Sequence, residues 1–363
     1  MFSTSFRFFT AILVMLFSQI NVFAQKIDID KKPVITRLIA LPSKPVDTSW
    51  HTFSYTFKGE NNLASWSIDV DQAKATYFKL SGYNTVEKGG DLHLEATLQP
   101  VRIVGSDVTK RSESSKDKSG RVTTTNYYRY VVSYESGLSW KLFDKNGKEL
   151  TPKAPGAGFG LVVGSNIKKK EGSEYGTYKE AYDSYYNNRA QITRDIAVAE
   201  LESLLGGMYE TVNSHYGYVP YKTRFNIWLL DTKGHPEQDA LTQHYQNVKT
   251  VFESISAYQL TQDNIDALKP SIEYYESIPQ KYQADEKADR KLRYAAFFNL
   301  SNIYLHLDNP TKAIEYANLL IQNDYDKGDG KDFVKDAGKL KELLASKQTA
   351  SRRFSRKAEI LEP

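Results

Sequence analysis

Histidines are the side chains best suited to metal binding or proton transfer, and this chain has six of them: His51, His93, His215, His235, His244 and His306. No two of them follow the H-E-x-x-H pattern that places two imidazoles on one helix face. His235 and His244 are too far apart along a helix to chelate one ion as a pair. The chain has no cysteine, so zinc and thiol chemistry lose their usual ligands. The sequence therefore predicts no metal site built from these residues.

Two glycine-containing segments resemble ligand-binding loops but have the wrong spacing. Residues 155–165 contain G-x-G-x-G instead of the dinucleotide pattern G-x-G-x-x-G, so a linker into a last strand is predicted there. Residues 324–330 resemble a calcium loop, but Gly328 stands in place of a ligand and Lys335 in place of the bidentate glutamate. A polar turn is predicted instead.

Catalytic motifs are also missing from the sequence. There is no G-x-S-x-G nucleophile elbow. Aspartate and glutamate are plentiful, so a carboxylate pair of the kind glycosidases use is left open, although no residue is singled out. We expect a protein without a cofactor and without catalytic activity.

Length and charge limit the remaining classes. The 363 residues suffice for two ordinary domains. Lys and Arg number 48 against 44 Asp and Glu, a net charge of +4, which lacks the strong basic excess of a nucleic-acid binder. The 25 tyrosines suit cores and binding faces equally, since tyrosine combines a large ring with a polar tip.

The first 24 residues have the pattern of a secretory signal peptide. Arg7 precedes a short apolar run over residues 8–17, and Ala24 ends a permissive cleavage site. The run is too short to span a bilayer, and no later stretch reaches that length. We therefore expect an exported chain, periplasmic or extracellular, cleaved near Ala24 and held together without disulfides.

Alternating apolar and polar residues dominate the first half of the chain. The clearest examples are residues 53–57, 66–70, 92–98, 128–134 and 138–142. Asn146-Gly147 is a strong hairpin turn signal. The pattern predicts an antiparallel β-sandwich or barrel over residues 27–165. Residues 105–120 are almost devoid of apolar side chains, which predicts a solvated, disordered hairpin tip, with a recognition loop as the alternative.

The second half has mainly helical periodicity, and we expect a helical domain over residues 177–346. Residues 223–230 form one interrupting strand that is apolar on both faces. Tyr178, Tyr182 and Tyr185 or Tyr186 recur at helical spacing, which predicts a packed face, with a sugar-stacking platform as the alternative. Residues 347–363 are basic and are expected to form a flexible tail.

Residues 291–325 form two amphipathic helical patterns joined by a short polar turn that contains Asn309. This stretch resembles one tetratricopeptide repeat (TPR). The residues at the repeat's signature positions are Phe297, Leu300, Ser301, Tyr304 and Ala313. Ala317, Leu320 and Tyr325 depart from the pattern. One copy cannot form a solenoid, so the prediction is a TPR-like helical array with one clear unit.

In the TPR family the first helix of each unit lines the partner-binding surface. The resemblance implies that Phe298, Asn302 and His306 contact a partner, while packing within the chain is the alternative. Two function classes follow from the sequence. The first is an exported, non-enzymatic scaffold that binds a protein or peptide in the bacterial cell envelope. The second is a carbohydrate-binding or carbohydrate-processing protein that uses the aromatic-rich β-domain.

Overall fold

The computed structural model describes residues 27–44, 46–47, 49–151 and 167–353. The leader at residues 1–24 and the glycine-rich segment at residues 155–165 lie outside these ranges. The described chain divides into two compact units. Residues 40–219 form a sheet unit, and residues 27–39 with 220–353 form a helical unit. The structure contains both helix and sheet, as predicted. The boundary between its two units does not lie at residues 165–177, because the helices between residues 178 and 216 belong to the sheet unit.

The sheet unit contains one five-stranded mixed sheet in the order β3-β2-β4-β5-β6. Strand β2 pairs in parallel with both β3 and β4, whereas β5 is antiparallel to both β4 and β6. The strands are β2 (Thr52–Lys58), β3 (Asn84–Thr85), β4 (Leu92–Lys116), β5 (Val122–Asp144) and β6 (Lys168–Glu171).

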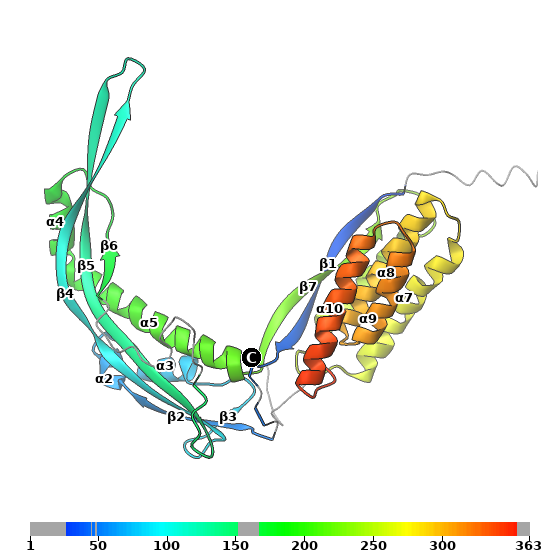
Figure 1. The fold of residues 1–363 in the computed structure, drawn as a ribbon, viewed down its shortest axis with the longest axis horizontal. Helices are drawn as coiled ribbons and strands as arrows, with labels where there is room; N and C mark the ends of the chain where they lie inside the picture. Colours follow the sequence, from blue (N-terminus) through cyan, green and yellow to red (C-terminus); the bar gives the residue numbers. More distant parts are fainter. Residues whose placement is uncertain (1–26, 45, 48, 152–166, 354–363) are drawn as a thin grey trace, which may run out of the picture. The chain divides into compact units, whose positions relative to one another are not determined.

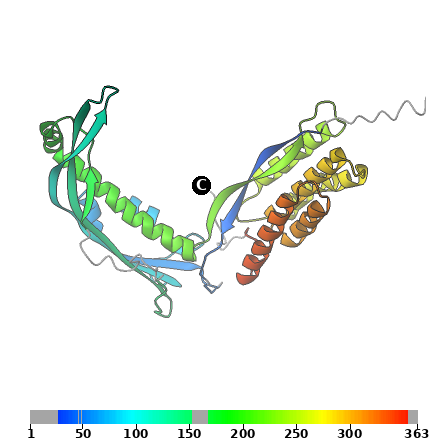
Figure 2. The same cartoon turned by 45° about the horizontal axis from the view of Figure 1, so that its top comes forward.

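Strands β4 and β5 are much longer than their neighbours. They remain paired from Leu92↔Asp144 to Lys116↔Val122, with irregularities between Gln99 and Gly105. Figures 1 and 2 show them continuing as a two-stranded hairpin beyond the other strands of their sheet. Residues 105–120, predicted to form a solvated tip, are therefore mostly paired strand. Only the turn around Asp117–Arg121 lies outside the ladder.

A long helix covers this sheet where a second sheet was expected. Helix α5 (Arg189–Tyr216) buries an apolar stripe that includes Ile196, Leu201 and Leu205. Its Glu200 accepts hydrogen bonds from Tyr134 Oη (3.1 Å), Ser136 Oγ (2.6 Å) and the Lys168 ammonium. The predicted sandwich or barrel is therefore wrong. Alternation along a strand shows that one face is buried but does not show what covers it.

Three short helices complete the sheet unit: α2 (Glu60–Ala64), α3 (Val70–Tyr77) and α4 (Tyr178–Asn187). Residues 66–70 were predicted as a strand and instead form a turn and the start of α3, which Asp69 caps by accepting from Gln72 N. Helix α4 begins with a capping box between Thr177 and Glu180.

In the helical unit, five helices pack in sequence beside a two-stranded antiparallel ribbon (Figure 1). The ribbon joins β1 (Ile29–Ala40) to β7 (Val219–Leu230), and the Asp231 N–H donates to the Asp28 carbonyl at its end. The interrupting strand predicted at residues 223–230 is thus present, and its partner is the first strand of the chain. The helices are α6 (Gln238–Ser254), α7 (Gln262–Lys281), α8 (Lys287–His306), α9 (Pro310–Gln322) and α10 (Lys327–Ser346).

Helices α8 and α9 form the helical hairpin that the TPR-like residues predict. Asn309 caps α9 by accepting from the Lys312 N–H at 3.1 Å. Leu300, Ser301 and Ala313 are fully buried, and Tyr304 stacks on Tyr316 with ring centroids 5.5 Å apart. Phe297 is partly buried against the core of this unit. Membership of the repeat family stays a prediction. Among the described residues, no helix is both long and apolar enough to cross a bilayer.

Candidate functional site

The face of α8 predicted to bind a partner lies against the chain's own strand β7. The His306 ring stacks on Phe225 with centroids 4.2 Å apart. Asn302 Nδ2 donates to the Asn226 carbonyl at 3.0 Å, and the Phe298 ring meets Trp228 at 5.9 Å. The structure brings the three residues onto one face, as predicted. That face is occupied, so the three residues have the alternative role of internal packing.

A second asparagine of α8 closes the same contact. The Asn299 side chain accepts from the Trp228 N–H at 2.7 Å and donates to the Trp228 carbonyl at 2.9 Å. It therefore satisfies both backbone groups of one residue of β7, as a neighbouring strand would. Asn299 and Asn302 are buried. An unpaired strand edge is a template for another chain, and here two side-chain amides of α8 take that place.

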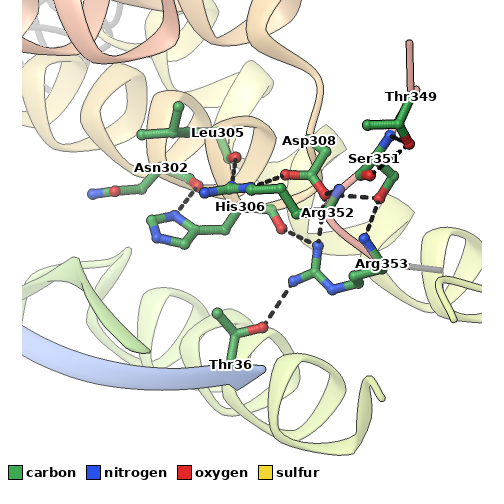
Figure 3. A network of polar contacts seen from close by, with 9 residues as sticks. All are labelled: Thr36, Asn302, Leu305, His306, Asp308, Thr349, Ser351, Arg352 and Arg353. Carbon is green, nitrogen blue, oxygen red and sulfur yellow. Dashed lines mark hydrogen bonds and ion pairs between the residues drawn. The ribbon is translucent and has the colours of Figure 1, made fainter. Parts of the chain in front are cut away.

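A C-terminal strap, residues 349–353, is bound to the helical unit (Figure 3). Asp308 accepts from the backbone N–H and the Nε of Arg352, at 2.7 and 2.6 Å, and from Ser351 Oγ at 2.7 Å. Arg353 donates to the His306 carbonyl at 2.6 Å and to Thr36 Oγ1 at 2.9 Å. The Asp308 and Arg353 side chains are at most 1% exposed. The predicted flexible tail is therefore wrong for residues 349–353, while residues 354–363 lie outside the described part of the chain.

The histidine beside the strap is kept neutral mainly by burial. Burial and, to a smaller extent, the guanidinium groups of Arg352 and Arg353 together lower the pKa of His306 to about 4. His306 Nδ1 lies 2.9 Å from the Asn302 carbonyl, so this nitrogen carries the proton and donates. A neutral, stacked imidazole is a packing residue at neutral pH and is not poised for proton transfer.

Four tyrosine–carboxylate hydrogen bonds connect elements of the helical unit. Glu237 accepts from Tyr274 Oη at 2.7 Å and from Tyr282 Oη at 3.2 Å. Two further contacts join Tyr316 to Glu276 and Tyr294 to Asp329. Burial and the adjacent carboxylate raise the pKa of Tyr282 to about 12 and that of Tyr274 still further. These phenols stay protonated at neutral pH and act as hydrogen-bond donors.

The calcium-like segment at residues 324–330 uses its carboxylates for other contacts. Asp326 caps α10 by accepting from the Gly328 N–H at 2.9 Å, and Asp329 accepts from Tyr294. Across the described residues, no group of three or more histidine, aspartate or glutamate side chains is arranged to hold a metal ion.

An exposed row of tyrosines on α4 is the strongest candidate for a binding site. Tyr178, Tyr182 and Tyr186 are 53%, 45% and 62% exposed. Their rings stack in series: the centroids of Tyr178 and Tyr182 are 6.3 Å apart at 13°, and those of Tyr182 and Tyr186 are 5.6 Å apart at 14°. Spacing of four residues places the three rings on one helix face. We refer to Tyr178, Tyr182 and Tyr186 as the tyrosine ladder.

The fourth tyrosine of the helix, Tyr185, has the opposite role. It is buried and packs on Tyr130 of β5, with centroids 5.5 Å apart. Ala181, one turn earlier, is also buried. These two residues attach α4 to the hairpin, and the ladder is thereby left facing outward. The sequence pattern predicted one packed tyrosine face, whereas the structure separates a packed residue from three exposed ones.

The ladder borders a groove of about 210 Å³ whose other side is β4. The β4 residues in its lining are Ser106, Asp107 and Val108, and Arg189 lies among the lining residues of the helical side. All of these lining residues belong to elements of the sheet unit. The pairing of β4 with β2 ends at Thr97. After that residue, β5 is the one strand that pairs with β4 in the described chain, so the other edge of β4 has no strand partner near this groove.

The ladder geometry indicates what the groove can bind. The three rings are nearly parallel, and neighbouring centroids lie 5.6 and 6.3 Å apart, within the range of interacting aromatic pairs. About half of each side chain is exposed, so ring surface and phenol groups are accessible. A polypeptide can use such rings for apolar contact and the phenols for hydrogen bonds. Tyrosine is also enriched in protein–protein interfaces.

Comparison of the chain with models of known protein families and with curated protein sequences gives no match. The functional interpretation therefore depends on the geometry of the chain itself.

Proposed function

We propose that this chain is an exported, non-enzymatic protein of the cell envelope that binds a protein partner through the tyrosine ladder. The observation that carries the proposal is the arrangement of three exposed, mutually stacked tyrosines beside an open strand edge. Each exposed ring has apolar surface in contact with water. Covering that surface with a partner stabilises the complex, because apolar area is removed from water.

The helical unit serves in this proposal as a TPR-like scaffold, and its α8 face is not the partner site. Phe298, Asn302 and His306 already contact β7. A partner could reach them only after β7 had separated from α8. The ladder needs no such rearrangement.

Export is supported by the leader pattern in residues 1–24. N-terminal sequencing of the protein recovered from its native cells is expected to begin near Gln25. A mature chain that starts at Met1 would contradict export through a cleaved signal.

The binding site is tested by replacing all three ladder tyrosines with alanine in the full chain. The partner is fixed by chemical cross-linking in intact cells, and its recovery is quantified by mass spectrometry. The triple variant is expected to lose the partner that the unaltered chain captures. A matched control replaces Tyr221, which is 39% exposed on β7, with alanine and retains capture.

Undiminished capture by a folded triple variant would contradict the proposed site. The carbohydrate alternative is addressed with the same proteins on a glycan array. Binding of glycans by the unaltered chain, lost in the triple variant, would favour that alternative over a protein partner.

A further inference from the structure

The outer part of the β4–β5 hairpin lacks the support that normally stabilises two paired strands. From Lys110 to Arg121 all residues are exposed, and so are residues 122–125 on the returning strand. A two-stranded hairpin without a buried face is marginally stable in water. The cross-strand contacts here are small polar ones, such as Ser114 with Thr124 (2.9 Å) and Ser112 with Asn126 (2.7 Å).

The free edge of β4 is directly beside the tyrosine ladder. In an antiparallel pair, every second residue directs its N–H and C=O away from its partner strand. Ser106, Asp107 and Val108 of β4 line the groove, and among the described residues β5 is the one strand that pairs with β4 at these positions. A helix that runs beside a free strand edge forms a slot in which an extended segment can add as a further strand.

Charges around the slot favour an acidic occupant. Two arginines of the hairpin are already neutralised: Arg111 pairs with Glu113 and Glu174, and Arg129 pairs with Glu171 and Glu174. Other exposed cations of the hairpin and groove have no ion pair among the described residues: Lys110, Lys116, Lys118, Arg121 and Arg189. In the same region the carboxylates without a cation partner are Asp107, Asp117 and Glu180, and each accepts local hydrogen bonds.

We propose that an extended acidic segment of a partner protein adds as a strand to the free edge of β4, with its side chains against the tyrosine ladder. This inference rests on the proposed function and specifies its binding mode. Backbone hydrogen bonds to β4 would supply affinity. The cation excess would select glutamate- and aspartate-rich segments, and the ladder would contact apolar side chains at alternate positions.

The test uses the full chain and a fluorescent twelve-residue peptide that repeats Glu-Thr-Glu-Val three times. Binding is measured by fluorescence anisotropy. Two derivatives carry N-methyl groups on alternate residues, one on the odd and one on the even positions. Strand addition uses one edge of the peptide, so one derivative is expected to lose binding and the other to keep it.

Charge reversal provides the matched protein variants. Lys110→Glu and Arg189→Glu are each expected to weaken peptide binding about tenfold, which corresponds to about 1.4 kcal/mol. The control is Lys339→Glu on α10, whose side chain is 66% exposed in the helical unit; it is expected to leave binding unchanged. Circular dichroism verifies that each variant is folded.

Hydrogen exchange locates the bound peptide. The strand-addition geometry predicts slower exchange for those β4 amides in residues 103–116 that point away from β5, because they have no strand partner in the free chain. Equal loss or equal retention of binding by the two N-methylated peptides overturns the proposal, as does competition by heparin with the same potency as the peptide. Absence of any peptide binding overturns it as well.

The two proposals fail separately. If the cross-linked partner depends on the ladder but the acidic peptide does not bind, the binding mode is wrong and the site stands. If the partner does not depend on the ladder, the proposed function itself is wrong.

Discussion

Tyrosines of the two units differ in what surrounds their hydroxyl groups. In the helical unit, Tyr274 and Tyr282 are partly buried and donate to the carboxylate of Glu237. In the sheet unit, the ladder tyrosines contact one another and remain about half exposed. The first arrangement stabilises a fold, because the hydrogen bond to a charged acceptor forms within the chain. The second leaves rings and hydroxyls available to another molecule.

Strand edges of the two units differ in the same sense. The helical unit closes the edge of β7 with the side chains of Asn299 and Asn302. The sheet unit leaves the outer edge of β4 without such a cover in the described part of the chain. Proteins normally protect long edges, because an open edge pairs with other chains. The helical unit therefore uses its tyrosines and its strand edge for internal stability, whereas the sheet unit leaves its own available for binding.

The largest expected effect on stability comes from breaking the strap of the helical unit. Asp308→Asn keeps a residue type that tolerates the positive φ of 58° at this position. It removes the charge that faces Arg352 and Arg353. Loss of one partner from a buried ion pair costs about 3–5 kcal/mol. Urea unfolding followed by hydrogen exchange in α8 measures the change.

The matched control for the strap is Lys312→Met, which removes an exposed pair with Glu315 on α9. Exposed pairs contribute about 0–1 kcal/mol. If the two variants lose equal stability, the strap is not a structural element.

A second effect is expected when the pH falls. The pKa of His306 is about 4 in the folded chain, below the ordinary value of about 6.5. The unfolded chain therefore binds the proton first, and stability declines as the pH falls from about 6.5 to about 4. The full shift corresponds to about 3 kcal/mol.

His306→Gln is expected to remove that part of the acid sensitivity of α8, measured as unfolding free energy between pH 4 and pH 7. The sheet unit supplies the comparison, because its buried Glu200 titrates in a lower range. Burial alone would raise the pKa of Glu200, but hydrogen bonds from Lys168, Ser136 and Tyr134 lower it below the usual value. An unchanged pH profile in the variant would show that His306 titrates normally.

A smaller effect separates the two kinds of tyrosine directly. Tyr274→Phe removes the donor to Glu237 and is expected to cost about 1–3 kcal/mol, since a charged buried acceptor loses a partner. Tyr182→Phe removes an exposed hydroxyl and is expected to stay within about 0.5 kcal/mol. Thermal unfolding of both variants checks the difference. Equal losses would mean that the ladder is part of the folded core.

Several elements of the fold could be predicted from the sequence because local chemistry determines them. The turn at Asn146-Gly147 forms as expected: Gly147 has a φ of 79°, and Asp144 accepts from the Asn146 and Lys148 N–H groups. The helical hairpin at α8 and α9 also follows from periodicity and from the Asn309 cap.

Other features depended on contacts between distant parts of the chain. The pairing of β1 with β7 joins residues about 190 positions apart, and no local pattern selects that partner. The burial of Arg353 depends on Asp308 and Thr36, so a basic tail and a docked strap have the same local composition. Polar residues 105–120 form strands because their partner strand continues opposite them.

The candidate site was visible in the sequence only in part. The repeat of Tyr178, Tyr182 and Tyr186 marks one helix face, and the polar residues around it could have indicated exposure. Which tyrosine packs inward depends on the position of Tyr130 across the hairpin. The α8 residues predicted to contact a partner lie against β7 in this structure, and that contact also depends on a distant part of the chain.

The most direct test of the central claim is site-specific photo-cross-linking in intact cells. A benzophenone amino acid replaces Tyr182 in one protein and Tyr221 in another, so that each unit carries one exposed probe. We predict a discrete protein adduct from position 182, with none from position 221. An adduct from position 221 alone would contradict the account and move the binding surface to the helical unit.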